Sequence, residues 1–92
     1  METYRSQQIE EKLKTFDGWA LVDAALEKHF KFKNFQDALV FINQVGQLAE
    51  EADHHPEIYN VYNRVTLRLN THSANGITHK DFDLAEKINS IT

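Results

Sequence analysis

One stretch of the chain decides its fold class: Arg64-Val65-Thr66-Leu67-Arg68-Leu69-Asn70. Polar and apolar side chains alternate here without exception, and successive side chains of a β-strand point to opposite faces of its sheet. The stretch therefore predicts a strand with one dry face and one wet face. Such strands are typical of an antiparallel sheet that is covered on one side only.

The segments beside this strand predict a second strand and the last helix. Residues 59–62 read as a strand, and Asn75-Gly76 supply a turn in the loop 71–77. Thr78 is expected to cap a helix, with Asp81 at the capping-box position three residues later. The apolar side chains of this helix are expected to face the core: Phe82, Leu84, Ala85, Ile88 and Ile91.

A longer helix is predicted from its cap, Asn34, to about Ala52. Its apolar side chains recur at helical spacing and predict the buried stripe: Phe35, Ala38, Leu39, Ile42, Val45, Leu48 and Ala49. Pro56 cannot continue a helix and disfavours helical backbone at His55. His54 and His55 are therefore predicted to lie on a loop just past the helix end.

The first third of the chain predicts a helix followed by a hairpin. Ser6 is the expected N-cap, and Ile9, Leu13 and Phe16 share one helical face before the turn at residues 17–18. Strands are expected over residues 19–22 and 26–32, with a bend between them at residues 23–25. Lys28 falls on the apolar face of the second strand, so we expect it near a sheet edge where its amine reaches water.

The predicted order of elements is α-β-β-α-β-β-α over a single domain, residues 1–92. This order predicts the α+β class: a four-stranded antiparallel sheet with three helices packed on one face. A chain of this length buries roughly 60–68% of its unfolded surface, which is enough for one hydrophobic core.

Composition excludes several classes of function. The net charge is −4 with acids and bases interspersed, which argues against a nucleic-acid-binding surface. There is no cysteine, which excludes disulfides, zinc-thiolate sites and iron–sulfur clusters. No apolar stretch approaches the ~20 residues of a membrane span, and the first residues lack the apolar core of a signal peptide. We therefore expect a cytoplasmic protein that binds neither membrane nor nucleic acid.

Histidines in two short segments are the candidate chemical groups: Asp53-His54-His55-Pro56 and Thr71-His72. Imidazole, with an unperturbed pKa of about 6.5, gives and takes protons near neutral pH. A metal site is the rival interpretation, but adjacent histidines usually point in different directions and no helical i, i+4 pair is present, so no metal is expected. No Gly-x-Ser-x-Gly motif points to a serine nucleophile. His29 and His79 are expected to be solvated.

The run from Glu50 to Val65, together with Thr71-His72, Asn75-Gly76-Ile77-Thr78 and Asp81, resembles the pterin-4a-carbinolamine dehydratases. Members of this family remove water from an oxidised tetrahydropterin, and the resemblance is densest from about residue 30 to residue 88. It implies a hydro-lyase that dehydrates a 4a-hydroxytetrahydropterin by histidine acid–base catalysis. It also implies no metal or organic cofactor, and assembly into a homodimer or homotetramer. The family's fold agrees with the fold predicted from the pattern.

The resemblance implies roles for matched positions. His54 and His72 would transfer protons, and His55 would chiefly bind the pterin. The remaining matched positions would bind or orient: Glu50, Asp53, Pro56, Thr71 and Asp81. Among these, Thr71 would support His72, and Asp81 could serve both as a helix cap and as the partner of an imidazole.

One position departs from the family pattern. Ile58 stands where members usually carry tryptophan, and isoleucine cannot stack on a pterin ring. Two other functions stay open beside the dehydratase. One is a non-catalytic protein-binding module, of the kind that serves as a dimerisation cofactor in transcription. The other is a pterin-handling protein of molybdopterin metabolism, which the change at Ile58 makes harder to dismiss.

Overall fold

Four antiparallel strands form one sheet in the order β1-β2-β4-β3 in the computed structural model, which describes residues 1–92. The strands are β1 (Ala20–Val22), β2 (Ala25–Lys31), β3 (Glu57–Val61) and β4 (Arg64–Leu69). The helices are α1 (Ser6–Leu13), α2 (Phe35–Ala52) and α3 (His79–Ser90), with a short 3₁₀ turn, η1 (His72–Ala74). The predicted α+β class and element order are confirmed.

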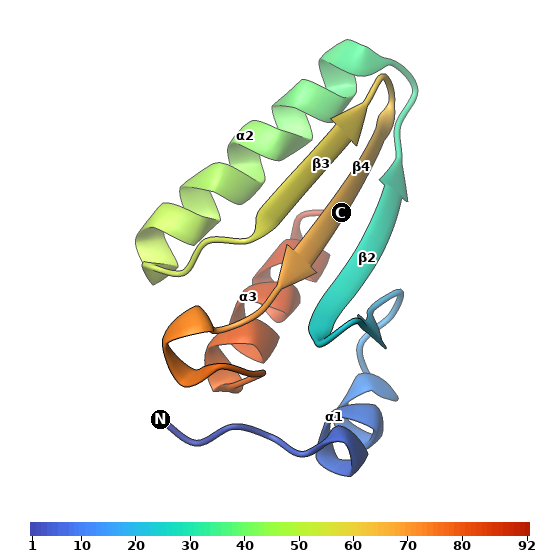
Figure 1. Cartoon of the computed structure of the whole chain (residues 1–92). Helices are drawn as coiled ribbons and strands as arrows, with labels where there is room; N and C mark the ends of the chain where they lie inside the picture. The colour runs from blue at the N-terminus through green and yellow to red at the C-terminus, as the bar shows by residue number, and fades with distance from the viewer.

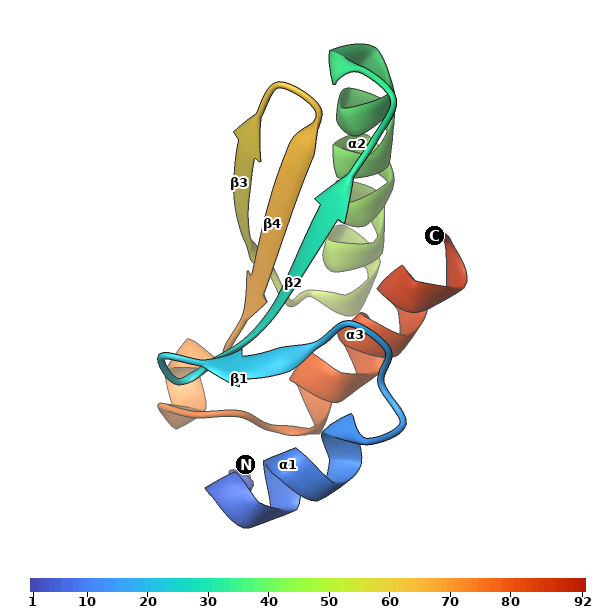
Figure 2. The ribbon, with the colours of Figure 1, turned by 90° about the vertical axis from the view of Figure 1, so that its right-hand side faces the viewer.

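The core lies between the sheet and the helices. Figure 2 shows α2 and α3 on the same side of the sheet, with α1 at the end near β1. The alternation that predicted β4 is confirmed, since Val65, Leu67 and Leu69 are all buried. Trp19, Leu26 and Ile77 also belong to the core, and the helices contribute the rest: Ile9, Ala38, Phe41, Val45, Ala49, Phe82, Leu84, Ala85 and Ile88. None of the helices has the length and apolar character needed to cross a membrane.

The buried face of α2 differs from the predicted stripe. Phe35 and Leu39 are 44% and 39% exposed, whereas Phe41, outside the predicted stripe, is 3% exposed. The ring centroid of Phe41 lies 4.7 Å from that of Phe30 and 4.9 Å from that of Phe32. Apolar residues occupy more of the surface of α2 than one face can bury. Contact with Phe30 in β2 and with Phe32 just past its end determines which face is buried.

Lys28 lies near a sheet edge, as expected, because the last pair between β1 and β2 joins Ala20 to Glu27 and leaves β2 unpaired on that side from Lys28 onward. Its amine donates to the carbonyl oxygen of Asp17 at 2.9 Å and to Asn89 Oδ1 at 2.8 Å. The same Asn89 oxygen accepts from Trp19 Nε1 at 2.9 Å. Loss of solvent around the amine lowers the pKa of Lys28. The lysine is thus accommodated by two oxygens that lie far from it in sequence.

Helix ends also depart from the predictions in detail. The N-cap of α1 is Arg5 rather than Ser6, and its backbone N–H donates to the Gln8 side chain at 2.8 Å. Phe16 lies beyond the end of α1, and Ile91 beyond the end of α3 is 37% exposed. Helical spacing alone cannot locate such ends, because the last turns depend on the contacts that follow them. Asn34 caps α2 as predicted, accepting from the Asp37 N–H at 2.8 Å.

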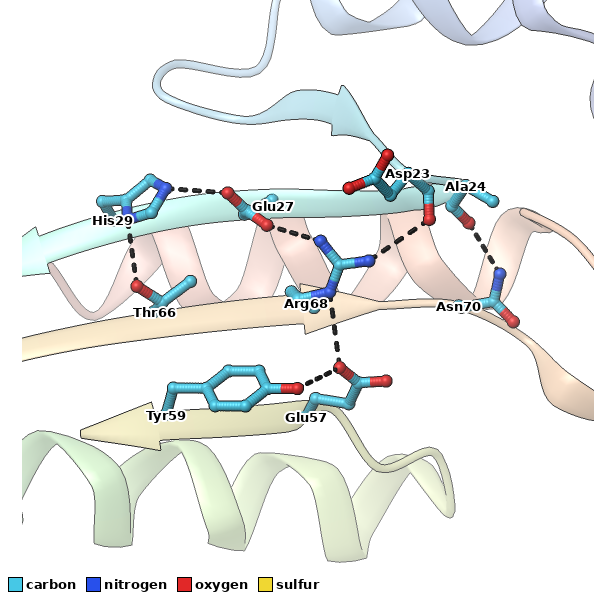
Figure 3. Close-up of polar contacts among 9 residues, drawn as sticks. All are labelled: Asp23, Ala24, Glu27, His29, Glu57, Tyr59, Thr66, Arg68 and Asn70. Carbon is cyan, nitrogen blue, oxygen red and sulfur yellow. Dashed lines mark hydrogen bonds and ion pairs between the residues drawn. The ribbon is translucent and has the colours of Figure 1, made fainter.

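The uncovered face of the sheet carries a ladder of polar side chains (Figure 3). Register places Glu27, Arg68 and Glu57 side by side on β2, β4 and β3. The guanidinium pairs with Glu27 at 2.5 Å and with Glu57 at 3.3 Å. His29, the next residue on this face of β2, contacts Glu27 at 2.8 Å and Thr66 at 2.9 Å. The bond from Arg68 lowers the pKa of Glu27, so this carboxylate is held in its charged form.

Candidate functional site

The end of α2 sends its two histidines in different directions. Asp53 adopts a left-handed backbone (φ 50°), which an aspartate tolerates better than most residues. Its N–H donates to the Glu50 carbonyl at 3.2 Å, and the His54 N–H donates to the Ala49 carbonyl at 3.0 Å. After this reversal the side chain of His54 is buried, whereas that of His55 is exposed. The predicted loop after the helix is confirmed.

The start of α3 supplies the partner of the buried histidine. Thr78 Oγ1 accepts from the Lys80 N–H at 3.2 Å, and Asp81 Oδ2 accepts from the Thr78 N–H at 2.9 Å. The capping box predicted from the sequence is present between Thr78 and Asp81, and the bond from the Thr78 N–H to Asp81 is one half of it. The other oxygen, Asp81 Oδ1, lies 2.6 Å from His54 Nε2. Asp81 therefore caps a helix and holds an imidazole at the same time.

Burial of the Asp81 carboxylate is tolerated because donors surround it. Asp81 has no exposed surface, and a buried charge is costly unless it is paired and hydrogen-bonded. Besides His54 and the Thr78 N–H, it accepts a bond from Thr71 Oγ1 at 2.8 Å. The hydroxyl of Thr71 also contacts that of Thr78 at 2.8 Å. Thr71 was expected to support His72, but its side chain bonds to Asp81 and Thr78 instead.

A pocket of about 250 Å³ brings the three candidate histidines together. Its lining residues come from the end of α2, the loop around η1 and the start of α3: Asp53, His54, His55, Asn70, Thr71, His72, Ser73 and Lys80. In Figure 1 these three segments meet at the end of the molecule where β4 runs into the orange loop. The loop is closed at its base, since the Thr71 N–H donates to the Gly76 carbonyl at 2.9 Å.

The other predicted site residues lie around this pocket rather than in it. Glu50 reaches His55 from the last turn of α2, with Oε2 at 2.5 Å from Nε2, and both side chains are more than half exposed. Pro56 leads into β3 and does not line the pocket. Ile58 lies outside the lining and is 38% exposed on β3.

Sequence reasoning missed part of the pocket. Asn70, Ser73 and Lys80 line it but carry no motif of their own. Lys80 could have been suspected, because it lies between the cap Thr78 and the candidate site residue Asp81. Across the chain, no three His, Asp, Glu or Cys side chains converge in a way that could hold a metal ion. The groups that do converge are suited to proton transfer: three imidazoles, one of them paired with a buried carboxylate.

Comparison with known proteins gives consistent results. Residues 2–91 match the family model described as Pterin 4 alpha carbinolamine dehydratase. A Sulfolobus acidocaldarius protein is 46% identical over 84 residues, covering 91% of this chain and 92% of its own. One from Picosynechococcus is 50% identical over 78 residues, covering 85% of each. Both are named, provisionally, pterin-4-alpha-carbinolamine dehydratases.

Solved structures agree in fold. The crystal structure of a Brucella melitensis protein, described as a transcriptional coactivator/pterin dehydratase, superposes with a TM-score of 0.92 at 43% identity and covers 98% of each chain. A pterin dehydratase-like protein described as a RuBisCO assembly factor of the α-carboxysome has a TM-score of 0.64 at 19% identity, over 78% of this chain and 83% of its own. The second likeness concerns the fold alone. The family match over nearly the whole chain and the close relatives agree, and the chain belongs to the pterin-4-alpha-carbinolamine dehydratase family.

Proposed function

We propose that this chain dehydrates a 4a-hydroxytetrahydropterin to the quinonoid dihydropterin. The observation that carries the proposal is the buried pair of His54 and Asp81, 2.6 Å apart, beneath a pocket that also presents His55 and His72. A site for protein binding alone has no need of a histidine held by a buried carboxylate. Family membership supports a dehydratase role in general terms.

The reaction needs two proton transfers and no change of oxidation state. The hydroxyl on C4a is a poor leaving group as hydroxide, so an imidazolium donates a proton as the C–O bond breaks, and water leaves. A second group accepts the proton from a ring nitrogen, and the electron pair of that N–H bond forms the C=N bond of the product. Each positioned proton transfer contributes typically ~10²–10⁴-fold to the rate.

The three histidines divide this work by their surroundings. His54, fixed at the base of the pocket by Asp81, and the exposed His72 from η1 are the proton-transfer groups. His55, beside Glu50 at the rim, binds the pterin. The pocket, of about 250 Å³, is smaller than the ~300–1,000 Å³ usual for small-molecule sites, so we expect it to enclose only part of a substituted pterin.

The direct test measures dehydration of the carbinolamine. A pterin-dependent hydroxylase generates the substrate, and loss of the carbinolamine is followed with and without the protein, because the compound also dehydrates unaided. We expect acceleration by the wild-type chain and none beyond background by a variant with both His54→Ala and His72→Ala. A wild-type rate equal to that of the double variant would exclude the proposal.

A second candidate is the protein-binding module. Apolar side chains on the outer face of α2 favour it, since Phe35, Leu39 and Val40 are 44%, 39% and 54% exposed. The Brucella melitensis relative is also described as a transcriptional coactivator. Absence of dehydration in the assay above, with the fold intact, would favour this module over the enzyme.

A further inference from the structure

We infer that Thr78, acting through Thr71, is a positioning residue that makes Nδ1 of His54 the nitrogen that exchanges a proton with substrate. This inference deepens the proposed dehydratase function and rests on it for its kinetic test. Thr78 and Asp81 have no exposed surface, and Thr71 is 3% exposed. The hydroxyl of Thr78 therefore has no water as an alternative partner, and Thr71 as a whole is almost entirely shielded from water.

The direction of each hydrogen bond in the group follows from counting protons. An ionised carboxylate only accepts hydrogen bonds, so the single hydroxyl proton of Thr71 is donated to Asp81 Oδ2, at 2.8 Å. The contact of 2.8 Å between the two threonine hydroxyls must then be a bond donated by Thr78. Thr78 Oγ1 in turn accepts from the Lys80 N–H at 3.2 Å. The bonds run one way, from the start of α3 through both threonines to Asp81, and bonds in such a series strengthen one another.

The series fixes how Asp81 faces His54. Two donors, the Thr71 hydroxyl and the Thr78 N–H, occupy Oδ2, at 2.8 Å and 2.9 Å. Oδ1 is thereby turned toward the imidazole, 2.6 Å from Nε2. Facing an ionised oxygen, Nε2 must carry a proton and donate it. The neutral His54 is therefore the Nε2–H tautomer, and its basic nitrogen is Nδ1.

The free nitrogen opens toward the pocket. His54 is a buried residue, and its Nδ1 makes no hydrogen bond within the chain. Every side-chain nitrogen or oxygen atom that is fully buried in this protein does have a hydrogen-bond partner. Nδ1 must therefore reach solvent, and the surface to which His54 contributes is that of the pocket. A general acid or base needs such an open nitrogen within reach of its substrate.

A first experiment reads the tautomer without any substrate. The ¹⁵N chemical shifts of imidazole nitrogens distinguish protonated from unprotonated atoms, at a pH well above 6.5. His54→Gln identifies the resonances. We expect Nε2–H in the wild type. In Asp81→Asn the amide oxygen must accept from the Thr71 hydroxyl and the Thr78 N–H, so the NH₂ group faces His54. The NH₂ group donates to Nε2, and we therefore expect the Nδ1–H tautomer. Nδ1–H in the wild type, or an unchanged Nε2–H in Asp81→Asn, would overturn the inference.

A second experiment separates positioning from capping. Thr78→Val removes the hydroxyl at nearly constant shape, Thr78→Ser restores it, and Asn34→Ala removes the cap of α2, far from the pocket in sequence. By analogy with partners of metal-bound histidines, whose loss costs roughly 10–100-fold, we expect Thr78→Val to lower kcat about tenfold with KM nearly unchanged. Thr78→Ser should keep kcat near the wild-type value. Asn34→Ala should lower the melting temperature, as Thr78→Val does, without lowering kcat.

The inference is overturned if Thr78→Val keeps the wild-type kcat while losing stability as Asn34→Ala does, because Thr78 is then only a cap. Failure of the proposed function looks different. If the wild-type chain has no dehydratase activity, the kinetic comparison gives no result. The His54 tautomers of the wild type and Asp81→Asn would still test whether Asp81 holds the proton on Nε2.

Discussion

Ile58 and Tyr59 are neighbours in β3 but lie on opposite faces of the sheet. Ile58 pairs with Leu67 on the face that the helices cover, and Tyr59 pairs with Thr66 on the uncovered face. The phenol of Tyr59 donates to Glu57 at 2.9 Å and belongs to the polar ladder around Arg68. Tyr59 therefore cannot supply an aromatic ring on the face of the sheet where Ile58 lies.

Ile58→Trp tests whether the missing ring matters for pterin binding. Ile58 is 38% exposed at an edge strand, so a larger side chain has room. We expect KM to fall roughly 2–12-fold, since aromatic stacking adds about 0.5–1.5 kcal/mol, with kcat little changed. The melting temperature should also change little. Weaker binding together with a lower melting temperature would instead mean overpacking around a reshaped surface.

His72→Ala is expected to lower turnover by ~10²–10⁴-fold if His72 transfers a proton in the transition state. The melting temperature should hold, because the side chain is exposed on η1 and has few packing contacts to lose. His79→Ala is the matched control: His79 is also exposed, seven residues later at the start of α3, and does not line the pocket. Equal turnover in the two variants would contradict the assignment.

Asn89→Ala should destabilise the fold without reaching the pocket. One oxygen of Asn89 accepts from both Trp19 Nε1 and the Lys28 amine, and its removal leaves Trp19 Nε1 without a partner and the Lys28 amine with only the Asp17 carbonyl. An unpaired buried donor costs about 1–3 kcal/mol, and for a domain of this size 1 kcal/mol corresponds to ~4–8 °C in melting temperature. Thermal unfolding at fixed protein concentration measures the effect. Asn43→Ala, on the exposed side of α2, is the control.

We propose that the chain forms a homodimer or homotetramer in which β3 takes part. This strand is an unpaired sheet edge without lysine or proline, and Tyr59 and Val61 on it are 55% and 64% exposed. Edges of this kind tend to pair with another chain. Sedimentation should show a dimer or larger species at micromolar concentration, and Val61→Lys should shift it toward monomer. A wild-type monomer under these conditions would exclude the assembly.

The polar ladder predicts a dependence of stability on pH. Arg68 lowers the pKa of Glu27 below its usual value of 4.5 in the folded state. A lowered pKa means that the stabilisation is present above about pH 4.5 and is lost as the pH falls through the folded-state value.

Glu27→Gln should therefore cost free energy of unfolding near neutral pH, and its difference from the wild type should shrink in acid. Urea titrations at several pH values measure the difference. Glu86→Gln, an exposed residue of α3 outside any ion pair, should show no such trend. A difference for Glu27→Gln that does not depend on pH would mean that the ion pair contributes nothing to stability.

Much of this protein was determined by short-range features of its sequence. Strict alternation over residues 64–70 produced a half-buried strand, because side chains of a strand must point to opposite faces. The caps Asn34 and Thr78 began their helices where expected, because a side-chain oxygen satisfies free N–H groups within a few residues. The histidine motif could likewise be recognised from the sequence, since it lies in two short segments.

Tertiary structure decided what depends on contacts between distant residues. Phe41 is buried rather than Phe35 because rings on another element pack against it, and helical spacing cannot tell which of several apolar residues meets them. The amine of Lys28, on the apolar face of β2, is bound by Asn89, 61 residues later. His54 met Asp81, 27 residues later, only because the end of α2 and the start of α3 come together. The sequence specifies which polar side chains are present, but packing brings them within the few ångströms over which hydrogen bonds act.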